Sequence, residues 1–300
     1  MSDSDVPSHR PAAPVEDAGD EAAADVDVGL FGPDSVTWRL HAEPLMGIAG
    51  ARALLLQALH PVAMTAFEEH GTLARDVWSR VTRTAEYVVV TTFGSTTQAM
   101  LAGSRVRAIH AQVHGTLPGG VEYAADEPQL LAWVHSCFVA SFLEVITRGG
   151  VALTGAEQDR YIAEQVKAAM LVGLEPDEVP HDRAGLRDYF RVIRPALECT
   201  PAARRTAQEL LTPPAPVPAD QGAAARPAWA GAAGLAFAAL PPWGRRLYAF
   251  TDLSGQAALT DAATTAGLQA LRSSLRGLHT SGAPMPTAAP PLRGPLRHLR

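Results

Sequence analysis

The stretch that decides the fold is IAGARALLLQALHPVAMTAFEE, residues 48–69. Its apolar residues recur on more than one helical face, which is the pattern of a helix buried on most sides. Proline lacks the backbone N–H that a helix interior needs, so Pro61 should bend or break this helix after His60. The stretch therefore predicts a buried helix at the centre of an all-α fold.

Helical patterns continue on both sides of this stretch. Residues 72–94 predict a long helix with Thr72 as N-cap and Gly94 as stop, although YVVVTTF, residues 87–93, also has the composition of a strand. Thr154 and Glu157 have the spacing of a capping box. Further helices are predicted over residues 97–114, 126–149, 154–173, 184–197, 228–240 and 261–278.

The predicted organisation is a single helical domain, residues 36–280, between two disordered tails. Residues 1–35 form an acidic arm, and residues 281–300 form a tail that contains prolines and arginines. Residues 212–227 are a Pro- and Ala-rich loop inside the domain, too poor in large apolar residues to join the core. A chain of 300 residues with 47% hydrophobic content can fill one large core.

Charge and cysteine content restrict the classes of function. The formal net charge of −6 gives no basic field for phosphate contacts, so we expect no nucleic-acid partner. Cys137 and Cys199 are far apart and form no CxxC, which indicates neither a thiolate zinc site nor a disulfide framework. The acidic N-terminus is unlike a signal peptide, and the nearest long apolar run, residues 49–67, is interrupted by polar residues. We therefore expect a cytoplasmic protein without a membrane span, of unspecified oligomeric state.

The chain lacks the common catalytic signatures GxSxG, HExxH, the P-loop and GxGxxG, and instead places polar residues inside apolar helices. In WSRVTRTAEY, residues 78–87, one helix face carries Arg80, Arg83, Thr84 and Tyr87. Two arginines on a surface helix are usually only solvated. This helix is also rich in valine, so part of the face should approach the core, where arginines need anions.

The segment RVRAIHAQVHG, residues 105–115, places Arg107, His110 and His114 near one helical stripe. His114 fits a helix C-terminus, where it would face the negative end of the helix dipole. His110 lies one turn deeper and, on this evidence alone, fits a core residue with a backbone partner better than a ligand. The pair also has the spacing of two ligands of a divalent metal, but no further ligand stands at an obvious spacing.

Two other histidines interrupt apolar helices. His60 fits a helix end at a proline break, or a residue lining a pocket beside that break. Trp133 is expected in the core, and His135 fits a core residue and a pocket wall equally well. One histidine for iron, arginines for two propionates and an apolar cavity would together make a complete haem site.

Four stretches, in this order, resemble the haem-dependent oxygenases related to rubber oxygenase (latex clearing protein) and to the MpaB-type oxygenase of mycophenolic acid biosynthesis. They span residues 38–143, with weaker similarity in PPWGRRLY, residues 241–248. The four stretches are WRLHAEPLMGIAGARALLLQALHPVAM, RVTRTAEYVVVTTFG, RVRAIHAQVHG and YAADEPQLLAWVHSCFVASFL.

The resemblance implies a helical fold with a globin-like core around haem b. It implies that His110 holds the iron, that Arg80, Arg83 and Thr84 line the haem pocket, and that Arg107 precedes the ligand. Within this set, Arg80 and Thr84 are the expected catalytic residues.

The chain departs from the rubber-cleaving members in two respects. Those members have a lysine where Arg83 stands here, and their extra N-terminal region has no counterpart in this sequence. Polyisoprene is therefore not the expected substrate. Glu68 and Glu69 are positional candidates for a catalytic carboxylate.

The predicted function is a haem b oxygenase that uses O₂ to oxidise or cleave a C=C bond of an unsaturated, apolar small molecule such as an isoprenoid. Arg80 and Arg83 would hold propionates or polarise the distal side, and Thr84 would donate a hydrogen bond there. Two alternatives remain open: a haem- or ligand-binding helical carrier or sensor without turnover, and a helical protein with no cofactor.

Overall fold

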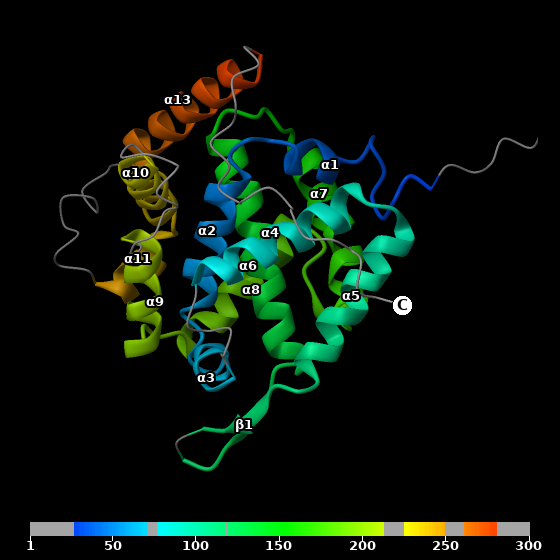
Figure 1. Ribbon diagram of the computed structural model, residues 1–300, viewed down its shortest axis with the longest axis vertical. Coiled ribbons are helices and arrows are strands. Elements are labelled where there is room, and N and C mark those ends of the chain that lie inside the picture. Colours follow the sequence, from blue (N-terminus) through cyan, green and yellow to red (C-terminus); the bar gives the residue numbers. More distant parts are fainter. Residues whose placement is uncertain (1–26, 71–76, 118, 213–224, 250–260, 281–300) are drawn as a thin grey trace, which may run out of the picture.

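The apolar stretch at residues 48–69 forms two consecutive helices at the centre of the fold. A computed structural model describes residues 27–70, 77–117, 119–212, 225–249 and 261–280, and this part is helical apart from loops, turns and one short hairpin. In Figure 1, α2, α4 and α6 lie in the middle, α9, α10, α11 and α13 lie on one side, and α5 and α7 on the other. The all-α prediction is confirmed.

The helices are α1 (Val36–His41), α2 (Met46–Gln57), α3 (Pro61–Glu69), α4 (Val77–Phe93), α5 (Thr96–His110), α6 (Pro128–Arg148), α7 (Gly155–Leu171), α8 (Arg183–Ile193), α9 (Pro201–Leu211), α10 (Ala225–Ala238), α11 (Pro242–Tyr248) and α13 (Asp261–Thr280). The two strands are β1 (His114–Thr116) and β2 (Glu122–Ala124), and they pair antiparallel. Short 3₁₀ turns cover Pro176–Glu178 and Arg194–Ala196.

The predicted break at Pro61 is confirmed. Helix α2 ends at Gln57, and α3 begins at Pro61, where the missing N–H costs no helical hydrogen bond. The ring of His60 accepts a hydrogen bond from the backbone N–H of Ala63 at 3.4 Å and so caps α3. His60 is therefore a helix-end residue.

The core forms where α2 crosses α6. Leu55 and Leu56 of α2 pack with Val145 and Ile146 of α6, and all four are at most 1% exposed. Trp133 of α6 is fully buried, as predicted, and its indole N–H donates to the carbonyl of Gln57 at 3.1 Å. This bond ties the C-terminal end of α2 to α6.

Helix α6 corrects the expectation that residues 49–67 are the nearest approach to a membrane-spanning segment. Its 21 residues have a mean hydropathy of 1.7 over the most apolar window, enough by length and composition to cross a membrane. However, 67% of that window is buried inside the protein. The core position of α6 accounts for its apolar composition.

Local signals place some helix ends correctly and others incorrectly. The capping box of Thr154 and Glu157 starts α7, and α4 ends at Phe93, directly before Gly94. The helix predicted to begin at Asp126 begins at Pro128, with Glu127 as an N-cap whose side chain makes no capping bond. Thr72 lies outside the described residues.

The edges of the domain differ in detail from the predicted ones. Asp27 already accepts hydrogen bonds from the backbone N–H and hydroxyl of Thr96, so ordered contacts begin before residue 36. Helix α9 was not predicted, and α10 begins at Ala225, inside the loop expected to end at residue 227. Residues 1–26, 213–224 and 281–300, where the tails and most of that loop were placed, lie outside the described part.

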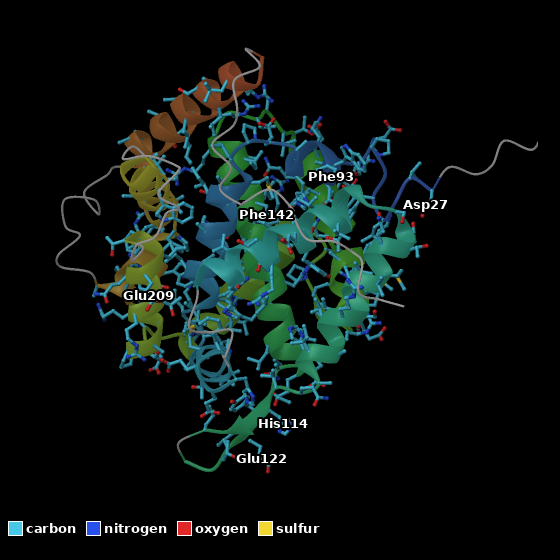
Figure 2. The ribbon with its side chains drawn as sticks, viewed as in Figure 1. Asp27, Phe93, His114, Glu122, Phe142 and Glu209 are labelled. Atoms are coloured by element: carbon cyan, nitrogen blue, oxygen red, sulfur yellow. The ribbon has the colours of Figure 1, made fainter. Side chains whose placement is uncertain are left out.

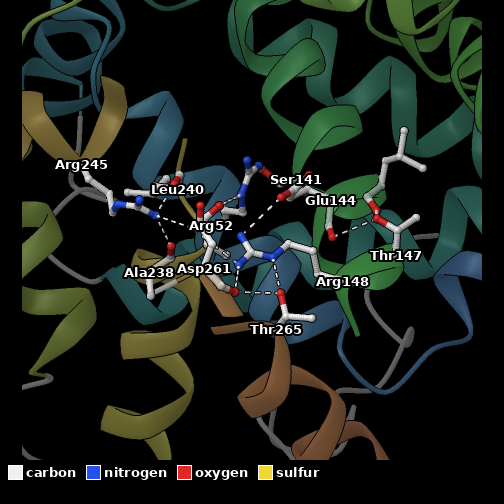
Figure 3. A network of polar contacts seen from close by, with 12 residues as sticks. Arg52, Ser141, Glu144, Thr147, Arg148, Ala238, Leu240, Arg245, Asp261 and Thr265 are labelled. Carbon is white, nitrogen blue, oxygen red and sulfur yellow. Dashed lines mark hydrogen bonds and ion pairs between the residues drawn. The ribbon is translucent and has the colours of Figure 1, made fainter. Parts of the chain in front are cut away.

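A polar network joins the C-terminal helices to the core (Figure 3). Arg52 of α2 is 5% exposed and donates to the carbonyl of Ala239 at 2.9 Å and to the hydroxyl of Ser141 at 2.7 Å. Arg245 donates to the carbonyls of Ala238 and Leu240 at 2.5 and 2.9 Å. Burial lowers the pKa of Arg52 to about 10, so its guanidinium is still charged at neutral pH. These arginines satisfy the unpaired carbonyls at the C-terminal end of α10.

Helix α13 is held by Glu43, whose side chain is 6% exposed. Its carboxylate accepts from Arg272 at 2.8 and 3.0 Å and from Arg276 at 2.6 Å. Burial alone would raise the pKa of Glu43, but the hydrogen bonds and charges of the two arginines outweigh burial and lower it. Glu43 is therefore ionised where it joins α13 to the loop before α2.

Candidate functional site

The polar face of α4 divides between interior and solvent. Arg80, Thr84 and Tyr87 are half-buried, whereas Arg83 is exposed. The guanidinium of Arg80 donates to the side-chain oxygen of Gln57 at 3.2 Å and lies 4.5 Å above the centre of the Phe67 ring. The structure thus brings Arg80 inside and leaves Arg83 at the surface.

Arg80 carries a charge that lacks a carboxylate partner within the described residues. Burial, together with the nearby charge of Arg83, lowers its pKa to about 10, so the guanidinium stays protonated at pH 7. Its side chain is surrounded by protein atoms but keeps some accessible surface, as expected of a residue that lines an interior space. A buried cation of this kind is costly unless an anion meets it.

A pocket opens beside Arg80 between α2, α3, α6 and α9. It is small: the space open to the centre of a water-sized sphere is about 20 Å³, enough for one or two water molecules. Apart from Gln57, Arg80 and Thr206 its lining is apolar, with Leu54, Ala58, Ala63, Met64, Phe67, Val134 and Leu210. The pocket therefore offers a mostly apolar wall with one cation.

His110 is the last residue of α5, and its ring nitrogen Nδ1 is buried without a hydrogen-bond partner in the described part of the chain. Burial lowers its pKa; the charge of Asp126 opposes this shift and the charge of Arg80 adds to it. His110 is therefore neutral at pH 7 and has a lone pair available for a metal. The influence of Arg80 also shows that the two side chains lie in the same region.

The prediction that His114 closes this helix is wrong. Helix α5 ends at His110, and the backbone N–H of Val113 donates to the His110 carbonyl at 2.9 Å in the turn that follows. His114 is exposed and begins β1, pairing with Ala124. Figure 2 shows His114 and Glu122 on the hairpin that projects from the helical body.

Two further polar groups lie inside near this region. The hydroxyl of Tyr87 is buried without a partner in the described residues, and burial raises its pKa to about 12. Burial lowers the pKa of His135 to about 4, so its ring is neutral. His135 is half-buried and is not among the residues that line the pocket, although Val134 beside it is, so the pocket-wall interpretation of His135 stays a prediction.

Arg107 joins α5 to α7 and does not point into the interior. Its side chain is exposed overall and its guanidinium donates to the carbonyl of Leu171, the last residue of α7. It thus caps the C-terminal end of that helix. Of the five predicted site residues, the structure brings Arg80, Thr84 and His110 inward and leaves Arg83 and Arg107 outside.

The candidate carboxylates are both engaged. Glu68 pairs with Arg205 of α9, and Glu69 accepts a hydrogen bond from the hydroxyl of Tyr123 at 2.5 Å. Sequence reasoning missed Gln57 and Phe67 as partners of Arg80. The signal for Gln57 was present, since a lone amide inside the apolar run LLLQALH needs polar partners.

Within the described residues, no group of three or more histidine, cysteine or carboxylate side chains is placed to hold a metal. His110 and Arg80 offer one buried histidine nitrogen and one cation, and the charge of Arg80 acts on His110. Arg80 lines the pocket, whereas His110 is not among its lining residues.

Comparison with known proteins identifies the family. Residues 38–273 match the family described as "ER-bound oxygenase mpaB/B'/Rubber oxygenase, catalytic domain". The chain belongs to this oxygenase family. The match covers most of the chain and confirms the resemblance seen in its four motifs.

The curated relatives carry less information. The oxygenase domain is 24% identical over 123 residues to the uncharacterized proteins Rv2237 of Mycobacterium tuberculosis and Mb2261 of Mycobacterium bovis. The aligned part is 41% of this chain and 48% of each relative, so the chain spans about half the length of the curated relatives it matches. No solved structure matches this oxygenase sequence significantly.

Proposed function

We propose that this member of the oxygenase family depends on haem b and acts on an unsaturated, apolar small molecule. The observation that carries the proposal is a pair of groups that lack counterparts. These are the buried, unpartnered ring nitrogen of His110 and the interior guanidinium of Arg80, which has no carboxylate within the described residues. Haem would satisfy both, because it contributes an iron and two carboxylates.

The residues present fit the cofactor in chemical type. His110 would hold the iron as a neutral imidazole, the form that its buried position favours. Arg80 would meet one propionate, and Thr84, one turn further along α4, would donate to the same group. Arg83 is placed for a propionate only where that group reaches the surface.

When bound, haem would supply the activation of O₂, and the remaining work falls to the chain. Burial keeps His110 unprotonated and ready to ligate. The apolar side chains that line the small pocket, among them Leu54, Phe67 and Leu210, would contact an apolar substrate where it approaches Arg80. Gln57 fixes the guanidinium of Arg80 at the edge of this pocket, so that its charge stays at one place while substrates exchange.

The absorption spectrum of the purified protein, with haem added, tests the cofactor. A Soret band should form in the wild type and in His114→Ala, whose side chain lies exposed on the hairpin, and should be lost in His110→Ala. The rate of haem release should be at least tenfold higher in Arg80→Met than in the wild type. A wild type that stays colourless after haem addition would refute the proposal.

Oxygen uptake tests the reaction itself. Terpenoids and short polyprenyl compounds, each compared with its saturated analogue, should raise oxygen consumption only when a C=C bond is present. A haem-loaded protein that consumes no oxygen with any of them would instead be the carrier or sensor.

A further inference from the structure

The hairpin that follows His110 is fastened to α3 at one point. Tyr123 of β2 is 3% exposed, and its hydroxyl donates to the carboxylate of Glu69, the last residue of α3, at 2.5 Å. Tyr123 is thus a buried side chain in an otherwise projecting element. The hydrogen bond joins two segments that are 54 residues apart in the chain.

Gly115 makes this close approach possible. It stands opposite Tyr123 in the strand pair, and a Cβ atom there would lie 2.7 Å from the tyrosine hydroxyl and 2.9 Å from the Glu69 carboxylate. Both distances are shorter than a side chain tolerates, so the contact requires glycine. Three segments, the end of α3 and both strands, therefore meet around one hydrogen bond.

The turn between His110 and the hairpin is bonded at both ends. The N–H of Val113 donates to the carbonyl of His110 at 2.9 Å, and the carbonyl of Val113 accepts from Ala125 at 2.8 Å. A displacement of the hairpin would therefore be passed to the last turn of α5, which carries His110.

An iron-ligating histidine normally has its ring orientation fixed by a hydrogen bond from its second nitrogen. Within the described residues neither ring nitrogen of His110 makes a hydrogen bond, so whichever nitrogen holds the iron, the ring depends on its backbone for orientation. We propose that Tyr123 and Glu69 form a latch that positions His110 by holding the hairpin behind it. This inference rests on the proposed role of His110 as the iron ligand.

Tyr123→Phe removes the donor and keeps the ring, whereas Glu69→Ala removes the acceptor. Glu69→Gln keeps an oxygen that can accept and is the conservative rescue. Glu122→Gln changes an exposed neighbour on β2 without touching the latch and is the matched control. All four variants are compared with the wild type, each with haem added to saturation.

Two measurements test the latch and the proposed haem ligation separately. Amide hydrogen exchange over residues 108–115, repeated without haem, should be at least tenfold faster in Tyr123→Phe and Glu69→Ala, with near wild-type rates in Glu69→Gln and Glu122→Gln. The iron–histidine stretching band of the reduced protein should shift or broaden in the same two variants only.

Each outcome decides a different claim. Unchanged exchange in Tyr123→Phe would overturn the latch. Faster exchange with an unchanged iron–histidine band would overturn its positioning role. A wild type without any iron–histidine band would refute the proposed haem ligation, while the exchange data would still report on the hydrogen bond.

Discussion

His41 should make the protein sensitive to acid. In α1, its Nδ1 lies 2.7 Å from the hydroxyl of Thr92, and its Nε2 lies 3.1 Å from the hydroxyl of Tyr161. The ring also meets Phe142 edge-on at 5.1 Å between centroids. Both nitrogens are occupied by hydroxyl groups and no carboxylate of the described residues is in contact, so burial lowers the pKa of His41 from 6.5 to about 3.

The sign of the effect follows from proton binding. Between pH 6.5 and pH 3 the unfolded chain binds a proton at His41 that the folded protein does not bind, so stability is lost as pH falls through this range. One such proton changes the free energy of unfolding by up to about 1.4 kcal/mol per pH unit. For the two pKa values, lowering the pH from 7 to 4 should cost about 3 kcal/mol.

Urea unfolding of the wild type and of His41→Gln, measured at several pH values between 7 and 4, tests this magnitude. The variant should be less stable at pH 7, because a hydroxyl loses its partner. The stability difference between the two proteins should then shrink by about 3 kcal/mol by pH 4. His114→Gln, at an exposed position, should follow the wild type. Parallel curves for wild type and His41→Gln would refute the reasoning.

Three other substitutions, two of them with a matched control variant, test the packing and capping of the helices. In Glu43→Gln the free energy of unfolding should fall by about 2 to 3 kcal/mol and α13 should become open to proteolysis, because the half-buried Arg272 loses its carboxylate partner. In Arg276→Gln, which changes a more exposed partner of Glu43, it should fall by less than about 1 kcal/mol. Gly103→Ala should lower the free energy of unfolding, measured by chemical denaturation, by about 1 to 3 kcal/mol, since its Cβ would lie 2.6 Å from the carbonyl oxygen of Leu171. In the control Gly50→Ala in α2, the new Cβ meets nothing within 4 Å, and the free energy of unfolding should rise by up to about 1 kcal/mol. Ser95→Ala should cost about 1 kcal/mol in thermal unfolding, because the hydroxyl of Ser95 caps α5; no change in melting temperature would contradict the role of that cap.

Sequence patterns predicted the features that local chemistry controls. Pro61 had to end α2, and the capping box at Thr154 had to start α7. The start of α9 carries a similar local signal, since Thr200 is its N-cap and Pro201 its first residue. The end of α5 could not be predicted in this way, because the contact of Tyr123 with distant Glu69 holds the chain after His110 as a hairpin.

The site was predicted in part for a geometric reason. Successive residues of a helix are about 100° apart, so Arg83 lies about 60° to one side of Arg80 and Thr84 about 40° to the other. The face that meets the interior includes Arg80, Thr84 and Tyr87, and Arg83 falls toward solvent. Spacing identified the stripe, whereas only packing could decide which edge of the stripe is buried.

The buried arginine network has a consequence for the smallest form of this protein that can fold. All described residues that line the pocket lie in or directly after α2, α3, α4, α6 and α9. A chain that stopped after α9 would nevertheless leave Arg52 without the carbonyl of Ala239, and Glu43 without Arg272 and Arg276. Arg52 and Glu43 would then lose the partners that hold them, and the core surface of α2 that α10 covers would be exposed to water. Helices α10 and α13, which do not line the pocket, are therefore needed for the fold that forms it. Shortened versions made for study should keep α13 as well as the pocket.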